Sequence, residues 1–400
     1  MKNLSKILCL RSKLVAIAFT LLFTGCASDA PANLQLKQTT EQSYRELWMV
    51  QVKQPSEISV NSTTRDLNGS VYLAGTYNPA YEPNQMHTMG NVAYYLAKYD
   101  RNGKLIFSKT VGFRSGTTIA NAVATDKTGN IYIGGTTSIG LSSTVQVGNN
   151  DYFIAKYDAT GNLIWTKQVG VPSANSQINA LIIDKHGDVY ATGFSEGDLS
   201  THKPNPTSTY FLAKYEPDGK LDWTKQFGNA QANMYGNAIA IDNSDNLYIG
   251  GNINQKWKYP NPNYDYFIAK FDDKGNPIWD QAGGNPNGKN ILKGIIFDKD
   301  KNIYIAGDTN AGVDKKKLIG IQDYFIVKYD QSGNKLWSQE FGDNNQRYFV
   351  LGTGSDKDGN LYISGNVSNE GNANFSLDAF IHEHNNTNGE IIWTNLAKIN

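Results

Sequence analysis

The sequence predicts an all-β fold built from one repeated unit. Segments Asp151–Asp158, Asp265–Asp272 and Asp323–Asp330 are nearly identical, and looser copies occur at 94–100, 209–216 and 378–385. Each copy is followed by a turn of the Asp-x-x-Gly type and by an apolar run centred on an aromatic residue. These aromatic residues lie 56 or 58 residues apart: Phe107, Trp165, Trp223, Trp279, Trp337 and Trp393. The 38 glycines and 23 tyrosines, against five methionines, are typical of strands and turns.

Each unit contains four short strand-like runs. In the second unit they are 121–126, 130–135, 151–158 and 162–170. Four strands repeated six times predict a β-propeller of six four-stranded antiparallel blades over residues 44–400. The second position of the innermost strand is always small, as expected where strands converge on an axis: Ser62, Ala122, Ala180, Ala238, Gly294 and Gly352.

The unit at Asp151–Gln168 resembles the SBBP-type β-propeller repeat of bacterial exported and surface proteins. The resemblance covers about residues 45–400. It implies seven blades, so a seven-bladed propeller is the alternative to six. Leu47–Val50 looks like an additional copy of the outer Trp strand. We expect it to dock on the last blade, beside or in place of Ile391–Asn395, and to close the ring.

Residues 1–25 have the features of an export signal, with a basic start and an apolar run from Leu14 to Phe23. The run ends in Phe23–Cys26, which resembles the lipobox of bacterial lipoproteins. The resemblance implies cleavage before Cys26 and a lipid such as palmitate on that cysteine; a plain secretory signal is the alternative. Residues 26–43 are then the lipidated cysteine and a flexible tether. In Gram-negative lipoproteins an Asp directly after the cysteine retains the protein in the inner membrane, and this chain has Ala27 at that position. The resemblance therefore implies that the protein is sorted to the outer membrane of a Gram-negative cell envelope.

Charge and cysteine content exclude several classes of function. The chain has 37 basic and 37 acidic residues. Four of the basic residues precede residue 26, so the mature protein has 33 basic against 37 acidic groups, a net charge near minus four. This charge gives no general attraction to nucleic acid. The two cysteines are Cys9 and Cys26; the first leaves with the signal and the second is acylated, which excludes a disulfide or a thiolate metal site.

Propeller geometry divides the loops between two faces. Tight turns link the first to the second strand and the third to the fourth. Long links join the second to the third strand at about 76–93, 136–150, 194–208, 252–264, 308–322 and 366–377, and they share the other face with the links between blades. Long loops on a rigid scaffold usually carry binding sites. We therefore select as candidate ligand-binding residues the aromatic and Arg side chains of this long-loop face, although each could equally pack against its own loop: Tyr77, Tyr81, Phe113, Arg114, Tyr235, Trp257, Tyr259, Tyr264, Arg347 and Tyr348.

Other motifs favour structural roles. The Asp-x-x-Gly turns lack the alternating carboxylates of a calcium loop and are explained by turn chemistry. The repeated lysines (Lys98, Lys156, Lys214, Lys270 and Lys328) are expected to have partners on adjacent blades. His382 and His384 share one strand face, but no third ligand is indicated, so we predict no metal site. Ser195 lies in a Gly-x-Ser-x-Gly string that we interpret as a loop residue, because the nucleophile elbow needs a following helix.

Three functions remain open. The favoured one is a non-catalytic, lipid-anchored envelope module that binds a protein or glycan through its long-loop face. The second is an envelope assembly scaffold similar to the propeller lipoprotein of the barrel-assembly machinery, whose repeats are shorter and number eight. The third, less favoured, is a propeller enzyme acting on a sugar or a quinone cofactor. No catalytic residue and no cofactor is predicted, and we expect no nucleic-acid partner.

Overall fold

The computed structural model describes residues 57–78, 92–112, 116–255, 264–285, 287–314, 316–356, 358–369 and 377–397. These residues form a six-bladed β-propeller, and each blade is a four-stranded antiparallel sheet in sequence order. The predicted fold class and the count of six blades are therefore confirmed. A search of the described residues for a helix long and apolar enough to span a membrane finds none.

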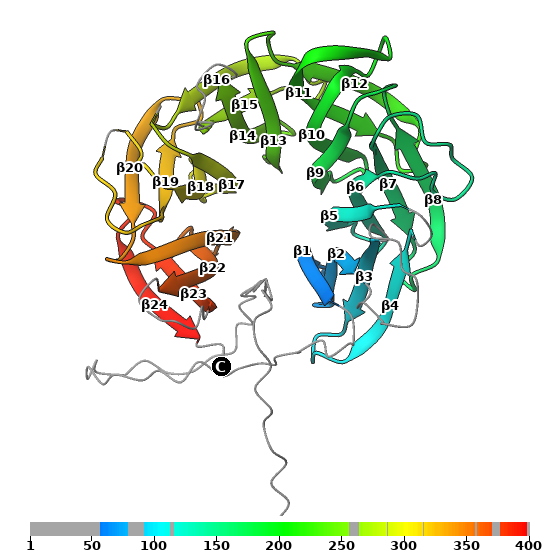
Figure 1. Ribbon diagram of the computed structural model, residues 1–400. Helices are drawn as coiled ribbons and strands as arrows, with labels where there is room; N and C mark the ends of the chain where they lie inside the picture. Colours follow the sequence, from blue (N-terminus) through cyan, green and yellow to red (C-terminus); the bar gives the residue numbers. More distant parts are fainter. Residues whose placement is uncertain are drawn as a thin grey trace, which may run out of the picture. The chain divides into compact units, whose positions relative to one another are not determined.

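The blades follow one another along the chain (Figure 1). Blades 1 to 3 are β1 (Glu57–Arg65), β2 (Val71–Asn78), β3 (Ala93–Tyr99) and β4 (Leu105–Val111); β5 (Thr118–Thr125), β6 (Ile131–Thr137), β7 (Asp151–Tyr157) and β8 (Leu163–Val169); β9 (Ser176–Ile183), β10 (Val189–Asp198), β11 (Lys203–Tyr215) and β12 (Leu221–Phe227). Blades 4 to 6 are β13 (Ala232–Ile241), β14 (Leu247–Gln255), β15 (Tyr264–Phe271) and β16 (Pro277–Gly283); β17 (Asn290–Phe297), β18 (Ile303–Thr309), β19 (Asp323–Tyr329) and β20 (Lys335–Phe341); β21 (Gln346–Ser355), β22 (Leu361–Asn369), β23 (Leu377–His384) and β24 (Ile391–Ala397).

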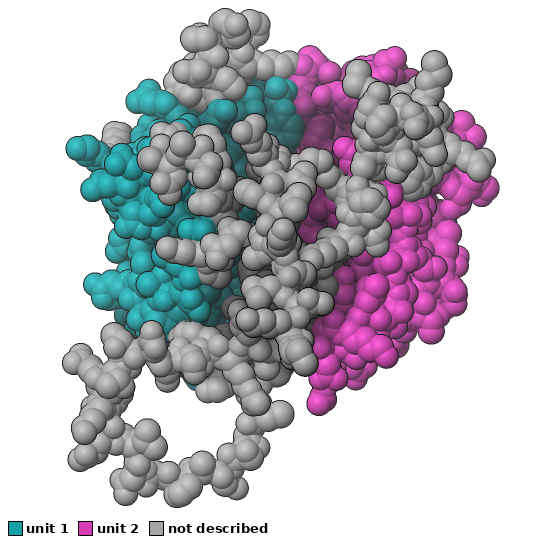
Figure 2. Space-filling model, turned by 60° about the horizontal axis from the view of Figure 1, so that its bottom comes forward, with its two compact units in different colours: residues 1–18, 231–400 teal, residues 19–230 magenta. Residues whose placement is uncertain are grey.

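The strands divide between two compact units, β13–β24 in unit 1 and β1–β12 in unit 2 (Figure 2). Within each unit the hydrophobic core lies between neighbouring blades. Tyr94 of blade 1 stacks on Phe153 of blade 2 with ring centroids 5.3 Å apart, and Tyr152 stacks on Phe211 of blade 3 at 5.1 Å. Both faces of a middle blade are thus covered, which explains why its central strands are apolar throughout.

Two expectations about local structure need correction. The region 194–208 was expected to be a long loop, but β10 and β11 extend into it as a hairpin in which Gly197 pairs with Pro204 and Asp198 with Lys203. Ser195 therefore lies in a strand. It is fully buried, and its Oγ is 2.9 Å from Ser176 Oγ, where the equivalent residues of blade 2 also pair their hydroxyls.

β24 occupies the outermost position of the last blade and pairs with β23. The Ile391–Asn395 segment is thus not replaced by another strand. The Leu47–Val50 segment that was expected to dock beside it lies outside the described residues, as does the predicted signal and tether region.

Every first strand contains a β-bulge immediately before its small residue. The extra residue, at which the strand register shifts, is Asn61, Asn121, Asn179, Asn237, Lys293 or Leu351. In blades 1 and 2 this asparagine connects neighbouring blades: Asn61 Nδ2 donates to Ala120 O, and Asn121 Nδ2 to Ile178 O, both at 2.9 Å. Because neighbouring first strands approach so closely, a Cβ on Gly294 would lie 2.2 Å from Thr353 Oγ1. This supports the predicted reason for the small residues.

Four of the five repeated lysines bind across blade boundaries, as predicted. Lys156 Nζ lies 5.0 Å from the centroid of the Tyr132 ring and donates to Pro217 O in the β11–β12 turn of the next blade at 2.9 Å. Trp165 Nε1 donates to the same carbonyl at 3.2 Å. Lys98, Lys270 and Lys328 make equivalent bonds to the following blade. Lys214 differs, because its ion pairs are with Asp188 and Asp222 of its own blade.

Candidate functional site

The face formed by the short turns is uniform. Most of these turns are organised by their first residue, an Asp whose Oδ1 accepts backbone N–H groups two and four residues later; the β11–β12 and β23–β24 turns begin instead with Glu216 and Asn385. At Asp126 these donors are Thr128 N and Asn130 N, both at 2.9 Å, and Tyr132 Oη donates to Oδ2 at 3.2 Å. Burial raises the pKa of the Asp126 carboxyl, but hydrogen bonds from the side chains and backbone of Thr128 and Asn130 hold it below its usual value. The carboxylates are occupied by their own turns, in line with the interpretation as turn chemistry.

The opposite, long-loop face is more varied, and its loops are held by buried polar groups. In blade 2 the fully buried Asp151 accepts Val147 N at 2.9 Å and Gly148 N at 2.7 Å. Gln168 of β8 adds two further bonds, because its Oε1 accepts Leu141 N at 2.9 Å while its Nε2 donates to Asp151 Oδ2 at 2.8 Å. We call this pair of side chains, which together hold the loop, the clamp. The loop 138–150 is thus fixed before any partner binds.

Blade 5 repeats this clamp with one chemical change. Asp323 accepts Ile319 N at 2.6 Å and Gly320 N at 2.8 Å, as Asp151 does in blade 2. The position of Gln168 is taken by Glu340, whose Oε2 accepts Val313 N at 2.8 Å. Burial and the neighbouring Asp323 carboxylate raise the pKa of Glu340 to about 7.

The clamped loops expose aliphatic side chains. Val145 is 80% exposed and Val147 50% exposed on the blade 2 loop, and Ile319, at the position equivalent to Val147, is 47% exposed on the blade 5 loop. Rigid loops that present apolar side chains are suited to binding, because little conformational entropy is lost on association. Sequence analysis selected only aromatic and Arg residues and missed these three.

Four of the predicted binding residues lie at strand positions and are half-buried. Tyr77 of β2 packs against the cluster of Tyr95, Ala97 and Tyr99. The others are Tyr235 of β13, Tyr264 at the start of β15 and Arg347 of β21. Tyr264 forms an isolated bridge with residue 289, and Arg347 one with residue 322.

Tyr348 is 3% exposed, so the structure places it in the core and not on the surface. Its hydroxyl donates to Asp343 Oδ2 at 2.6 Å, and its ring packs on Phe380 with centroids 5.0 Å apart. The remaining candidates lie outside the described residues: Tyr81, Phe113, Arg114, Trp257, Tyr259 and the lipidation candidate Cys26.

The histidine pair of β23 is part of the core. Tyr324 Oη is 2.6 Å from His382 Nδ1 and 3.0 Å from His384 Nε2, and His384 Nδ1 is 2.9 Å from Gly389 O. Burial lowers the pKa of both imidazoles to about 4, and for His382 the neighbouring His384 adds to the effect. The described residues contain no group of three or more His, Cys, Asp or Glu side chains that could hold a metal ion.

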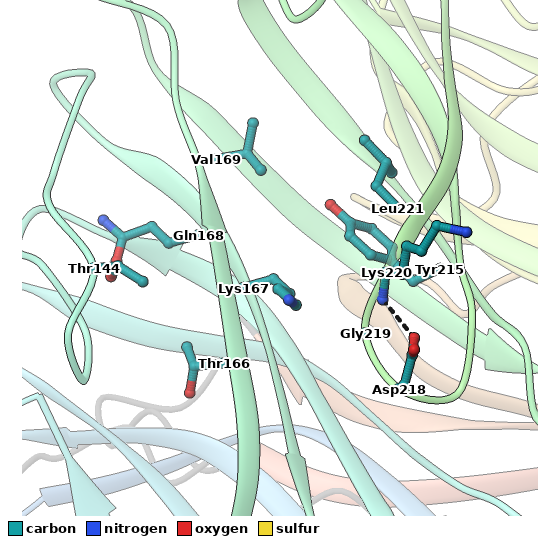
Figure 3. A pocket seen from close by; sticks show the side chains of 10 residues that line it. All are labelled: Thr144, Thr166, Lys167, Gln168, Val169, Tyr215, Asp218, Gly219, Lys220 and Leu221. Carbon is teal, nitrogen blue, oxygen red and sulfur yellow. Dashed lines mark hydrogen bonds between the residues drawn. The ribbon is translucent and has the colours of Figure 1, made fainter.

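A groove of about 600 Å³ runs between β8 and the β11–β12 turn in unit 2 (Figure 3). Thr144 and Lys167 lie on one side of it, and Asp218 and Lys220 on the other. Asp218 is its only lining carboxylate, and Asp218 Oδ1 accepts Lys220 N at 2.8 Å. General acid–base chemistry commonly uses a pair of carboxylates, and one carboxylate lines this groove.

The comparisons with known proteins agree with the repeat structure. The SBBP β-propeller repeat model matches residues 106–141, 164–199 and 222–255, so the chain contains SBBP-type β-propeller repeats. The chain is 26% identical over 216 residues to the regulatory protein FlaEY of Caulobacter vibrioides, a match that covers 49% of this chain and 22% of that protein. It is 25% identical over 374 residues to an uncharacterized WD repeat-containing protein, L264, of Acanthamoeba polyphaga mimivirus, covering 68% of this chain and 26% of that protein.

The chain thus spans about a quarter of the length of these curated relatives. Among solved structures, a PL25 ulvan lyase bound to a saccharide is similar with a TM-score of 0.49 and 14% identity, and the match covers 84% of this chain and 83% of the lyase. A likeness at this level carries no argument about function.

Proposed function

We propose that this chain of SBBP-type repeats is a non-catalytic binding module of the bacterial cell envelope, anchored through a lipid on Cys26, which binds a protein or glycan with its long-loop face. The β-propeller fold supports a binding or scaffold module in general. The finer assignment rests on the contrast between the two faces. One face consists of uniform short turns, whereas the other carries loops that differ from blade to blade.

The observation that carries the proposal is the clamping of exposed apolar loops by buried polar groups. Val147 and Ile319 are presented at equivalent places, and each is fixed through its own backbone N–H to a fully buried Asp. A loop that only connected two strands would not need this arrangement. Preorganised apolar side chains on a polar surface are typical of recognition sites.

The lipid anchor can be tested separately. We expect the intact chain, expressed in a Gram-negative host, to incorporate labelled palmitate and to sediment with membranes. Cys26→Ser should abolish both properties, because no other cysteine of the mature chain could carry the lipid. A Cys26→Ser protein that still carries label and sediments would contradict lipid anchoring at this residue.

The binding face can be tested by site-specific photo-crosslinking in cells. A photo-reactive amino acid at Val145, on the long-loop face, should give a discrete crosslinked species detected by protein or glycan staining. The matched control is Leu67 on the short-turn face, which is 83% exposed against 80% for Val145. Equal crosslinking at both positions, or crosslinking at Leu67 alone, would contradict the proposed binding face.

A substitution test complements the crosslinking. Val145→Ser combined with Val147→Ser removes two exposed side chains without touching the bonds that fix the loop, which involve backbone groups. We expect the affinity for the captured partner to fall by about tenfold, the effect of losing one or two apolar contacts in an interface. Leu67→Ser should leave affinity unchanged. Unchanged affinity in the Val145/Val147 variant would remove this loop from the binding surface.

A further inference from the structure

The clamp of blade 5 contains a titratable carboxyl group, Glu340, where those of blades 2 and 3 contain a glutamine amide. Gln168 and Gln226 occupy equivalent positions on β8 and β12, and each uses its amide as both acceptor and donor. Gln226 Oε1 accepts Leu199 N at 2.6 Å, and its Nε2 donates to Gly197 O at 2.8 Å and to Thr209 Oγ1 at 2.9 Å. An amide performs this double role at every pH.

Glu340 keeps the accepting half of this arrangement and lacks the donating half. Its Oε2 accepts Val313 N, as Gln168 Oε1 accepts Leu141 N. Its Oε1 is buried and has no hydrogen-bond partner among the described residues. The Oε1 atom occupies the place of an amide nitrogen that, in blade 2, donates to the carboxylate of Asp151. Only a carboxylic proton lets Glu340 donate in the same direction.

We propose that a proton shared between Glu340 and Asp323 holds the blade 5 loop (residues 310–322) in place, so that the presentation of Ile319 depends on pH. When the proton is present, the pair reproduces the Gln168–Asp151 bond of blade 2. When it is lost, two carboxylates face each other in a buried site, and their repulsion weakens the clamp. The consequence for partner binding rests on the proposed function, whereas the clamp itself does not.

The charges around the pair favour this behaviour near neutral pH. Burial raises the pKa of Glu340 to about 7; Val313 N lowers it, Asp323 on β19 raises it, and Lys316 of the loop lowers it. Lys316 Nζ is bound to Ser338 O at 2.6 Å, and Asp314 of the same loop pairs with Lys335 at 2.7 Å. The counter-charge of Lys316 therefore only partly offsets burial and the second carboxylate.

The sign of the effect follows from linkage. The pKa of Glu340 is higher in the clamped state than in an opened loop, where it returns toward the usual value for Glu. The clamped state therefore binds more protons, and the clamp weakens as pH rises from the lower to the higher of the two pKa values. Above the higher pKa value, a further rise in pH does not weaken the clamp any more. Below the lower value the full strength of the clamp is present.

Hydrogen–deuterium exchange of the full chain tests the proposal without a ligand. After correction for the intrinsic pH dependence of amide exchange, protection of peptides covering 310–322 should fall about tenfold between pH 5.5 and 7.5, while protection of 138–150 stays constant. The loop 138–150 is the internal control, because the same clamp there uses Gln168. Equal pH dependence of the two loops would overturn the proposal.

Two substitutions sharpen the test. Glu340→Gln should abolish the pH dependence of the 310–322 loop, and Gln168→Glu should transfer a similar dependence to the 138–150 loop. If Glu340→Gln does not fold, the wild-type comparison and the Gln168→Glu chain still decide. A Glu340→Gln protein that keeps the tenfold change, or a Gln168→Glu protein that does not acquire it, would refute the shared proton. Because these readouts need no partner, they are independent of the crosslinking outcome.

Discussion

A single glycine in each second strand permits the bulge that brings neighbouring blades together. The carbonyl of the residue two positions before the bulged one points at this glycine, and a Cβ on Gly135 would lie 1.8 Å from Ile119 O. The same conflict recurs within 1.8–2.0 Å in all six blades, at Gly75, Gly135, Gly193, Gly251, Gly307 and Gly365. The second glycine of the Ile-Tyr-Ile-Gly-Gly strand is thus required by a backbone contact.

Replacing this glycine should be costly. We expect Gly135→Ala to lower the free energy of unfolding by about 3 kcal/mol, because the backbone of β5 or β6 must move to relieve the contact. Gly354→Ala is the matched control, since Gly354 also lies in a strand and nothing lies within 4 Å of its added Cβ. Chemical denaturation of both variants measures the difference. Equal stabilities would show that the bulge adapts without strain.

At the level of the element, the strand order and the blade boundaries could be predicted from sequence because every unit repeats the same apolar runs and turns. The bulges could not, since an extra residue in one strand changes hydrogen-bond register without changing the apolar pattern. The extended hairpin of β10 and β11 was missed for a related reason. The polar stretch 200–206 has the composition of a loop, but the pairing of Asp198 with Lys203 continues the ladder through it.

The candidate site was predictable only in part. The division into a short-turn face and a long-loop face follows from strand order, and the short turns have the expected Asp chemistry. Which loop side chains are exposed depends on the clamps, which join residues from separate strands such as Asp151 and Gln168. Tyr348 illustrates the limit: it lies next to a loop in sequence, yet the alternation of β21 turns it into the core between β19 and β23.

The contacts that Lys156 makes across the boundary between blades 2 and 3 should contribute measurably to stability. Lys156→Met keeps the aliphatic stem but removes the contact with the Tyr132 ring and the bond to Pro217 O. We expect a loss of about 1–2 kcal/mol, because a charge-assisted hydrogen bond and a cation–π contact are lost while burial of the ammonium is relieved. Lys127→Met, at an exposed turn of the same blade, is the control in the same denaturation experiment. A Lys156→Met protein as stable as the control would show that relief of burial balances the lost contacts.

At the scale of the whole molecule, the two units contain titratable groups whose pKa values shift in different directions. Unit 1 contains His382 and His384, whose pKa values burial lowers to about 4, and Asp308, whose pKa burial raises to about 6. In unit 2, hydrogen bonds from Thr160 and the following turn lower the pKa of Asp158, and those from Ser200 and Thr201 lower that of Asp198 to about 2. The described part of unit 1 should therefore be the more pH-sensitive between pH 4 and 8.

The histidines make blade 6 acid-sensitive. The folded-state pKa of each imidazole lies below its usual value of 6.5, because the folded blade favours the neutral ring. The free energy of unfolding is therefore highest above pH 6.5, and it decreases as the pH falls toward 4. At pH 4.5 the loss amounts to about 3 kcal/mol for one imidazole. We expect an endoprotease active at both pH values to cut within β21–β24 at pH 4.5 but not at pH 7, and to leave β5–β12 intact at both.

A variant that copies the residues of another blade into blade 6 provides a control for this acid sensitivity. His382 and His384 occupy the positions of Ala155 and Tyr157 in blade 2, and in blades 1 and 2 the third-strand tyrosines Tyr94 and Tyr152 bond the hydroxyls of Tyr157 and Tyr215. His382→Ala combined with His384→Tyr should therefore give Tyr324 a hydroxyl partner that does not titrate below pH 8. We expect blade 6 of this variant to resist proteolysis at pH 4.5 as β5–β12 do. Continued cleavage in β21–β24 would mean that acid opens this blade through groups other than the two imidazoles.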